Sequence, residues 1–262
     1  MPAEPTAKPD RTTGVQVIAR AAEILRLLQS RPGGLSQAEI CERIGLARST
    51  VHRILGALES EGLVASSGPR ARYRLGPEIP RLAEAARNSL VIDLRPYLEK
   101  LARDMHETVD LSVLERTLVT FVDQVVTPHR LRAVSAVGAS FPAHSSANGK
   151  ALLAELDDAA IASILPDRLE PLTPNTLTTR AALLDELAEV RRTGIAFDRE
   201  EHTEGISAVG AAIHGPWGTA AISVPMPTQR FTGREDKHAA ALRAAIAHLE
   251  ATADYIGSSD SP

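Results

Sequence analysis

The chain has 262 residues, with 29 Lys and Arg against 33 Asp and Glu, a single Cys, and a formal net charge of -4. This length suggests two domains that each bury a core. One Cys excludes an intramolecular disulfide framework and a thiolate-rich zinc site, and it fits a reducing, cytoplasmic compartment. Residues 1–13 hold prolines and charges but no apolar core, and no later stretch approaches the ~20 apolar residues of a bilayer crossing, so we expect no signal peptide and no membrane span.

The charge is distributed unevenly along the chain. Residues 1–90 carry 13 basic and 9 acidic side chains, a net of +4, and residues 91–262 carry 16 basic and 24 acidic ones, a net of -8. Nucleic-acid affinity depends on the local field rather than on the total charge. A basic first part beside an acidic second part is therefore compatible with DNA binding.

The first 76 residues predict a disordered tail at 1–13 followed by a small helical domain. Apolar residues spaced by three and four predict a helix over 17–28. Ser36 with Glu39 three residues later has the spacing of a capping box, so a second helix begins there. The remaining pattern predicts a third helix at 49–58 and two short strands, at 63–65 and 72–75. This order is that of a winged helix-turn-helix, which we place at residues 14–76.

The second part of the chain predicts an α+β domain. A linker helix is expected within residues 77–90, then a domain at 91–256 and a disordered tail at 257–262. Strands in runs with helices at their flanks favour a central antiparallel sheet. The predicted helices are 78–86, 94–105, 146–156, 158–165, 180–193 and 234–255, and the predicted strands are 109–114, 118–126, 131–136, 195–198, 208–214 and 220–224.

The strongest local signal is the helix-turn-helix at residues 37–54. Two helices that pack at a steep angle need a small residue at their contact, a turn glycine four residues later, and branched apolar residues on the second helix. Cys41, Gly45, Val51 and Ile54 occupy those places. We interpret Cys41 as a small packing residue. An ordinary helical hairpin is the alternative.

The outward face of the second of these helices is basic and hydroxylated, without an acidic residue. Hydroxyl groups suit phosphates, and an Arg can donate two hydrogen bonds to a guanine in the major groove. Arginines at the hairpin tip would contact the DNA backbone or the minor groove, unless they form an ordinary surface cluster. The predicted DNA-binding residues are Ser36, Gln37, Arg48, Ser49, Thr50, His52, Arg53, Arg70 and Arg72.

The run at residues 38–55 (AEICERIGLARSTVHRIL) resembles the DNA-binding region of the IclR family of bacterial transcriptional regulators. Two later segments are similar to that family as well, residues 143–151 (AHSSANGKA) and residues 194–202 (GIAFDREEH), the latter followed by Gly205-Ile206. The resemblance covers roughly residues 15–256. Three motifs in this order and spacing are more specific than a helix-turn-helix alone.

The resemblance implies a winged-helix reader, a linker helix and a GAF-like effector-binding domain. It also implies a homodimer, often a dimer of dimers, on a palindromic double-stranded DNA operator. The second domain would sense a small molecule, expected to be an organic acid, and no cofactor is implied. The positions that match the family's effector pocket are Ala147, Asn148, Asp198, Ile206, Ala208, Ser223 and Pro225.

The residues around Ser146 support such a pocket independently. Ser146 can cap the following helix, whose first amides would then face an anion, although a plain capped helix on a sheet is the alternative. Pro225 stands where the family can have a hydroxyl residue and Ala147 where it can have Gly, so we expect a less polar pocket and a different ligand. Asp198 would repel a carboxylate unless it is protonated or holds a ligand hydroxyl, or it serves as a structural acceptor.

Catalytic and metal sites find little support. Asn148-Gly149-Lys150 ends like a phosphate loop, but positions 144 and 151 lack the required residues. No nucleophile turn and no zinc-protease motif occur, and His144, His202 and His214 lack ligand spacing. We therefore predict no enzyme, no catalytic residue and no metal. Two alternatives stay open: an enzyme acting on a small organic acid with an accessory DNA-binding segment, and a winged-helix protein whose second domain only oligomerises.

Overall fold

A computed structural model describes residues 11–67, 72–133 and 135–258, and the chain divides into two compact units, 1–86 and 87–262. Residues 1–10 and 259–262 of the predicted tails lie outside the described residues. The rest of those tails is helical, contrary to the prediction, because the first and last helices extend further than their apolar spacing indicated. None of the described helices has the length and apolarity that a membrane crossing requires.

The first unit is a winged helix-turn-helix whose core is built from apolar residues of its three helices and its strands. Ile24, Leu28, Ile40, Val51 and Leu55 are each at most 2 % exposed. A small antiparallel sheet with strand order β1-β3-β2 closes the unit. Its elements are α1 (Arg11–Gln29), β1 (Leu35–Ser36), α2 (Gln37–Ile44), α3 (Arg48–Ser60), β2 (Val64–Ser67) and β3 (Arg72–Leu75).

Both ends of α2 are set by local chemistry. The Ser36 side chain accepts a hydrogen bond from the Glu39 amide, and the Glu39 carboxylate accepts one from the Ser36 amide, so the predicted capping box is confirmed. Gly45 ends the helix in the left-handed region with φ 69°, a conformation that costs a glycine little, and its amide donates to the Cys41 carbonyl. These two ends hold α3 in a defined direction relative to α2.

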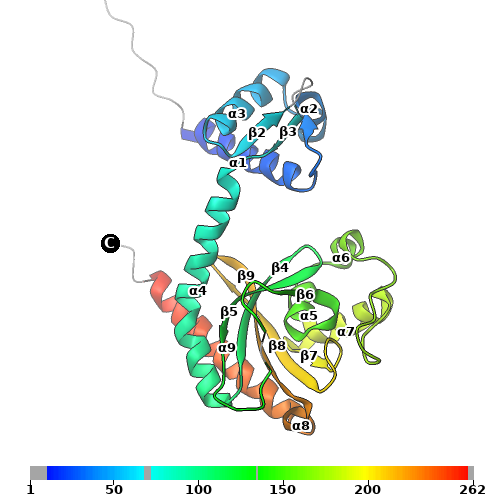
Figure 1. Cartoon of the computed structure of the whole chain (residues 1–262). Helices are drawn as coiled ribbons and strands as arrows, with labels where there is room; N and C mark the ends of the chain where they lie inside the picture. The colour runs from blue at the N-terminus through cyan, green and yellow to red at the C-terminus, as the bar shows by residue number, and fades with distance from the viewer. Residues whose placement is uncertain (1–10, 68–71, 134, 259–262) are drawn as a thin grey trace, which may run out of the picture. The chain divides into compact units, whose positions relative to one another are not determined.

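In the described part of the second unit, six antiparallel strands form one sheet with the order β6-β5-β4-β9-β8-β7. Helices α4 and α9 pack on one face of this sheet, and α5, α6 and α7 lie on the other (Figure 1). The predicted α+β class with a central antiparallel sheet is confirmed. The elements are α4 (Glu78–Met105), β4 (Val109–Glu115), β5 (Leu118–Val125), β6 (Ser140–Pro142), η1 (Ala143–Ser145), α5 (Ala147–Ala154), α6 (Asp158–Ile164), α7 (Arg180–Thr193), β7 (Ala196–Arg199), β8 (Ile206–Gly215), β9 (Gly218–Pro227), α8 (Thr228–Phe231) and α9 (Glu235–Ser258).

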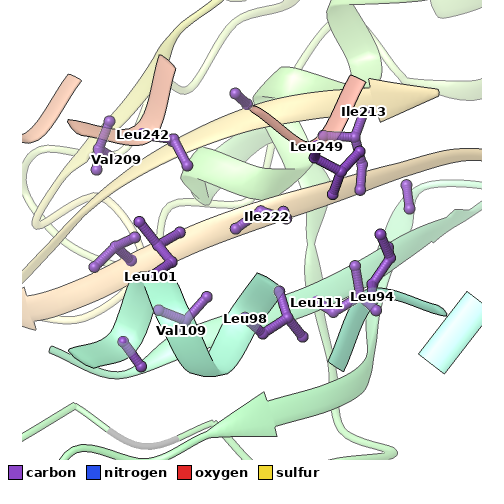
Figure 2. Packing of buried hydrophobic residues seen from close by; sticks show 14 of the residues in the cluster. Leu94, Leu98, Leu101, Val109, Leu111, Val209, Ile213, Ile222, Leu242 and Leu249 are labelled. Atoms are coloured by element: carbon purple, nitrogen blue, oxygen red, sulfur yellow. The ribbon is translucent and has the colours of Figure 1, made fainter. Parts of the chain in front are cut away.

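Alternation along the strands gives the sheet two different faces. Successive side chains of a strand point to opposite sides, so Val209 and Ile213 on β8 share one face while Ala208 and Ala212 share the other. The first face is the main core, where leucines of α4 and α9 meet the strand side chains (Figure 2). The second face carries small residues, which leaves room for α5 and for a cavity.

Two predicted elements are corrected by the structure. The helices predicted at 78–86 and 94–105 are one helix, α4, because Leu90 and Leu94 continue the buried stripe and no glycine interrupts it. Pro96 lies inside α4, where the carbonyl it leaves unbonded belongs to Ile92, an exposed residue open to water. No strand forms in the described part of 131–136. The strand that follows β5 in the chain and pairs with its free edge is β6 instead.

Two glycines allow α5 to lie close to its neighbours. A Cβ at Gly149 would come within 2.2 Å of the Ala143 carbonyl oxygen, and one at Gly210 would come within 2.8 Å of the Ala147 carbonyl carbon. Both obstacles are backbone atoms, which cannot rotate away. Glycine at these positions therefore fixes how closely the start of α5 approaches η1 and β8.

We predict that Gly149→Ala destabilises the second unit by about 2 to 3 kcal/mol, because the added methyl group forces backbone atoms apart. The matched control is Gly56→Ala in α3, a helical glycine where an added methyl group would meet no described atom within 4 Å beyond its own stretch of helix. That change should stabilise the chain by up to about 1 kcal/mol. Thermal unfolding measures both, and a Gly149→Ala variant as stable as the parent would contradict the close approach.

Candidate functional site

The outer face of α3 presents basic and hydroxyl groups to solvent. Arg48, Ser49, His52 and Arg53 are exposed, while the opposite face of the helix is buried in the core of the unit. Thr50 is half-buried and, together with Arg53, lines a groove of about 470 Å³ between α3 and α1. The structure thus places four of the five predicted α3 residues on the surface, free to approach a nucleic acid.

The start of α3 is suited to a phosphate. Ala47 occupies the N-cap position, and no described side chain caps the helix there. The uncapped N-terminus of a helix carries partial positive charge and amide donors, which favour anions. Gln37 Nε2 donates a hydrogen bond of 2.9 Å to the Arg48 carbonyl, so this residue ties the start of α2 to the start of α3.

The other predicted DNA-binding residues have different surroundings. Ser36 is engaged in the capping box of α2. Arg72 on β3 donates to the carbonyls of Gly33 and Gly34 and lies 3.5 Å from the Glu39 carboxylate, so the turn after α1 holds its guanidinium. Arg70 lies outside the described residues. A DNA contact by any of these three stays a prediction.

The second unit contains a cavity of about 260 Å³ on the sheet face opposite α4 and α9. Three of the predicted residues form a row across neighbouring strands, since Asp198 pairs with Ala208 and Ala208 pairs with Pro225. One step along, Ser223 pairs with Asp110 of β4. The cavity brings together every effector residue expected from the family resemblance: Ala147, Asn148, Asp198, Ile206, Ala208, Ser223 and Pro225.

The start of α5 forms another wall of the cavity, in a way that corrects one expectation. Ser146 stands at the N-cap position of α5, but its side chain makes no capping hydrogen bond. Its hydroxyl is buried at the cavity wall and has no hydrogen-bond partner among the described residues. Asn148 is held by its Nδ2, which donates 2.9 Å to the Ser112 hydroxyl. Ser146 thus offers a free buried hydroxyl where a cap was expected.

The cavity also has lining residues beyond the seven effector residues that the family resemblance implied. Asp110 was detectable as a lone charge within a β-branched and apolar strand, and His202 stands inside a segment that carried the resemblance. Ser146 and Thr203 lie next to residues already named, and the others come from β5, β6 and the segment between them, which no pattern linked to α5. These additional lining residues are Asp110, Phe121, Arg132, Ala133, Ser135, Phe141, Ser146, His202 and Thr203.

Three aromatic rings form one side of the cavity. Phe121 and Phe141 meet edge to face with centroids 4.8 Å apart, and Phe141 stacks on the His202 ring at 3.8 Å. Burial, together with the nearby His144, lowers the pKa of His202. The imidazole is therefore neutral at pH 7 and serves as a flat wall with a polar edge.

Two buried carboxyl groups line the cavity, one on β7 and one on β4. Burial raises the pKa of Asp198 to about 7, against the opposing effect of the hydrogen bond from the Glu201 amide. Burial also raises the pKa of Asp110 to about 6, although the side chains of Gln124 and Ser135 donate hydrogen bonds to it. Both groups are thus poised between their charged and neutral forms near neutral pH.

The three histidines weighed as a metal site do not gather. The Nε2 atom of His144 lies 3.0 Å from the Glu170 carbonyl, that of His214 lies 2.8 Å from the Glu155 carboxylate, and His202 stacks on Phe141. Within the described residues, no group of three or more His, Cys, Asp or Glu side chains is arranged to hold a metal ion.

Comparison with known proteins accounts for both units. The model of the IclR helix-turn-helix domain matches residues 17–68, and that of the bacterial transcriptional regulator IclR C-terminal domain matches residues 83–251. The HTH-type transcriptional regulator Rv1719 of Mycobacterium tuberculosis is 60 % identical over 92 % of this chain and 93 % of its own length. TtgV of Pseudomonas putida, also an HTH-type transcriptional regulator, is 40 % identical over 85 % of this chain and 86 % of its own.

A solved structure gives the same result for the fold. The crystal structure of the Thermotoga maritima IclR matches with a TM-score of 0.59 and 25 % identity, covering 91 % of this chain and 98 % of that one. The relatives found by sequence are transcriptional regulators and repressors. This chain belongs to the IclR family of bacterial transcriptional regulators, as a DNA-binding regulator with an N-terminal helix-turn-helix domain and a C-terminal effector domain.

Proposed function

We propose that this regulator binds a palindromic operator through α3, as a homodimer or a dimer of dimers, and that a small organic acid in the cavity of the second unit changes its operator affinity. The observation that carries the ligand part is the convergence of Ser146, the start of α5 and strands β7 to β9 on one cavity. The exposed basic face of α3 carries the DNA part.

The cavity has the elements that an acid needs. The unpartnered Ser146 hydroxyl can donate to a carboxylate, and the start of α5 adds the positive end of a helix. Arg132 contributes a cation at the cavity wall. Small residues and the rings of Phe121 and Phe141 provide apolar surface for the carbon skeleton of the ligand. One relative, 31 % identical over 88 % of this chain, is named the acetate operon repressor of Salmonella typhimurium.

The two buried carboxyl groups are compatible with an anionic ligand when they are neutral. A protonated carboxyl donates a hydrogen bond, so Asp198 or Asp110 can bind a ligand oxygen in that form. Once ionised, either group would repel a carboxylate at close range. Because their pKa values lie at about 7 and about 6, we expect acid binding to weaken as the pH rises through this range.

We also propose that the cavity binds its ligand without transforming it. A hydrolytic site needs a nucleophile within hydrogen-bond reach of its base. His202 stacks on Phe141, and its Nδ1 lies 2.8 Å from the Thr203 hydroxyl, so the ring is oriented by neighbours other than the cavity serines. The alternative of an enzyme with an accessory DNA-binding segment would require a turnover assay with the bound acid to show product.

We predict that Arg48→Ala and Arg53→Ala each weaken operator binding by about 1 to 3 kcal/mol, because each removes an exposed base or phosphate contact from α3. The matched control is Arg103→Ala, which removes an exposed arginine from α4 in the other unit. Fluorescence anisotropy with an operator selected from random DNA measures the affinities. Unchanged binding in both α3 variants would place the recognition surface elsewhere.

We predict that Ala208→Leu abolishes binding of the cognate acid, with a loss of at least about 10-fold, because the larger side chain fills the cavity between Asp198 and Pro225. Ala208→Ser, which adds one oxygen, is the control that keeps the space. Calorimetry with a panel of small carboxylic acids identifies the ligand on the parent first. An Ala208→Leu variant that binds this acid as tightly as the parent does would refute the cavity assignment.

We predict that Asp198→Asn stabilises the second unit by about 1 to 3 kcal/mol at pH 8 and has little effect near pH 4. In the folded parent the raised pKa keeps Asp198 protonated up to about pH 7, whereas in the unfolded chain Asp198 loses its proton above the ordinary pKa of 3.8. The parent therefore loses stability as the pH rises from about 4 to about 7. Asn carries no charge and can still accept from the Glu201 amide.

Chemical denaturation followed by the fluorescence of Trp217, the one Trp of the chain, measures this difference in the second unit. Asp185→Asn, which neutralises an exposed aspartate on α7, is the matched control. A stability gain of Asp198→Asn that shrinks with rising pH would contradict the assignment of a neutral Asp198.

A further inference from the structure

A lysine with no exposed surface lies behind the cavity. Lys150 follows Asn148 by two positions on α5, and its side chain is 0 % exposed. Its ammonium group donates to both carboxylate oxygens of Glu201, at 2.6 and 2.7 Å, and to Glu186 Oε1. A buried charge is tolerated only when it is paired and hydrogen-bonded, so this three-residue cluster is a built feature of the unit.

The cluster reaches the cavity through a single residue. Glu201 binds Lys150 with its side chain, and its amide donates a 2.7 Å hydrogen bond to Asp198 Oδ1. Asp198 lines the cavity, whereas Lys150, Glu186 and Glu201 do not. The charge of Lys150 therefore acts on Asp198 at the cavity wall through Glu201, without Lys150 itself lining the cavity.

The turn after β7, which carries Glu200, Glu201 and His202, is anchored by two sets of contacts. On its outer side, the Thr173 hydroxyl donates to the Glu200 carbonyl and the Thr176 hydroxyl donates to the Glu201 carbonyl, both at 2.6 Å. On its inner side, Lys150 holds the Glu201 carboxylate. The same turn presents His202 to the cavity. The two threonine contacts remain when the charge of the cluster changes, so the turn keeps anchors that do not depend on Lys150.

We propose that Lys150 is a positioning residue of the effector cavity: through Glu201 it holds the turn after β7 and sets the charge that Asp198 presents to the ligand. The role of this charge in ligand choice rests on the proposed function, because it matters for regulation only if the cavity binds the effector. The electrostatic link itself is a property of the ligand-free chain.

The members of the cluster affect the pKa of Asp198 in different directions according to their charge. Glu201 lies on the same turn, Lys150 approaches from α5, and Glu186 is connected through Lys150 from α7. Burial is the main cause of the raised pKa of Asp198, and among the charges Glu201 raises it while Lys150 lowers it. The other charged or titratable groups near this wall are Asp110 of β4, His144 of η1, the cavity-lining Arg132 and His202, and the exposed Arg199, whose guanidinium lies over the Phe197 ring.

The interaction of Lys150 and Glu201 with Asp198 predicts that replacing either residue shifts the titration midpoint of Asp198, in opposite directions. Lys150→Gln removes a cation and should move the titration midpoint of Asp198 to higher pH. Glu201→Gln removes an anion, keeps the amide that donates to Asp198, and should move the midpoint to lower pH. Each shift should be at least about half a pH unit for charges at this distance in a buried site. A purely structural role would not separate the two variants by sign.

The test is a pH titration of the full-length, ligand-free protein carrying ¹³C at the Asp side-chain carboxyls, followed by NMR. Asp198→Asn assigns the resonance by its disappearance. Glu189→Gln, on α7 and paired with Arg192 outside the cluster, is the matched control and should leave the midpoint unchanged. Opposite shifts in Lys150→Gln and Glu201→Gln support the proposal, and unchanged midpoints or shifts of the same sign overturn it.

If Lys150→Gln does not fold, Glu186→Gln replaces it in the test. The Glu186 side chain is 26 % exposed, so removing its charge disturbs the buried cluster less than removing the charge of Lys150 does. This variant frees Lys150 to act on Glu201 and should lower the Asp198 midpoint, less than Glu201→Gln does. A midpoint that is raised or unmoved in either Glu variant overturns the proposal. Opposite shifts without binding of any carboxylic acid would instead refute only the proposed effector.

Discussion

The register of β4, β8 and β9 is the constraint on which the rest of the second unit depends. Because side chains alternate along a strand, the pairing that turns Val209 and Ile213 toward α4 and α9 also turns Ala208 and Gly210 toward α5. A slip of one residue would reverse both faces and bury the polar row in the leucine core. One set of hydrogen bonds therefore creates the core and the cavity together.

Close packing of α5 follows from that register. Gly210 pairs with Ser223, and its missing side chain lets the start of α5 approach the sheet, while Gly149 lets η1 approach α5. All eight residues of α5 are buried as a result. A lysine in such a helix must find its partners inside the protein, which explains why Lys150 is surrounded by Glu186 and Glu201 and why its charge is felt at the cavity wall.

The DNA-binding unit depends on shorter-range interactions. A capping box at Ser36, the left-handed Gly45 and the buried side of α3 suffice to orient its exposed face. Among the described residues, its hydrophobic core is built from the first unit alone. A ligand in the cavity can change operator affinity only by favouring one state of the whole molecule over another, and the coupling must be equal in both directions.

The sequence by itself determined the helix-turn-helix, the α+β class and the identity of seven cavity residues. Caps, turn glycines and periodicity act over a few residues, so they can be recognised along the chain, and the resemblance to the family supplied the cavity positions. The local sequence pattern gave wrong secondary structure where a contact with residues far along the chain decides which element forms. The break predicted within α4 is absent because Leu90 packs in the main core, and the strand expected at 131–136 is replaced by β6, which pairs with β5.

Only the tertiary structure decided which further groups share the cavity. Asp110, Phe141 and His202 are separated by tens of residues, and they meet because the strand order β6-β5-β4-β9-β8-β7 places their elements around the start of α5. The same arrangement leaves the Ser146 hydroxyl without a partner among the described residues and brings Lys150 behind Asp198. Burial then sets the charges of these groups, and burial depends on what covers a residue in space, which no spacing along the chain specifies.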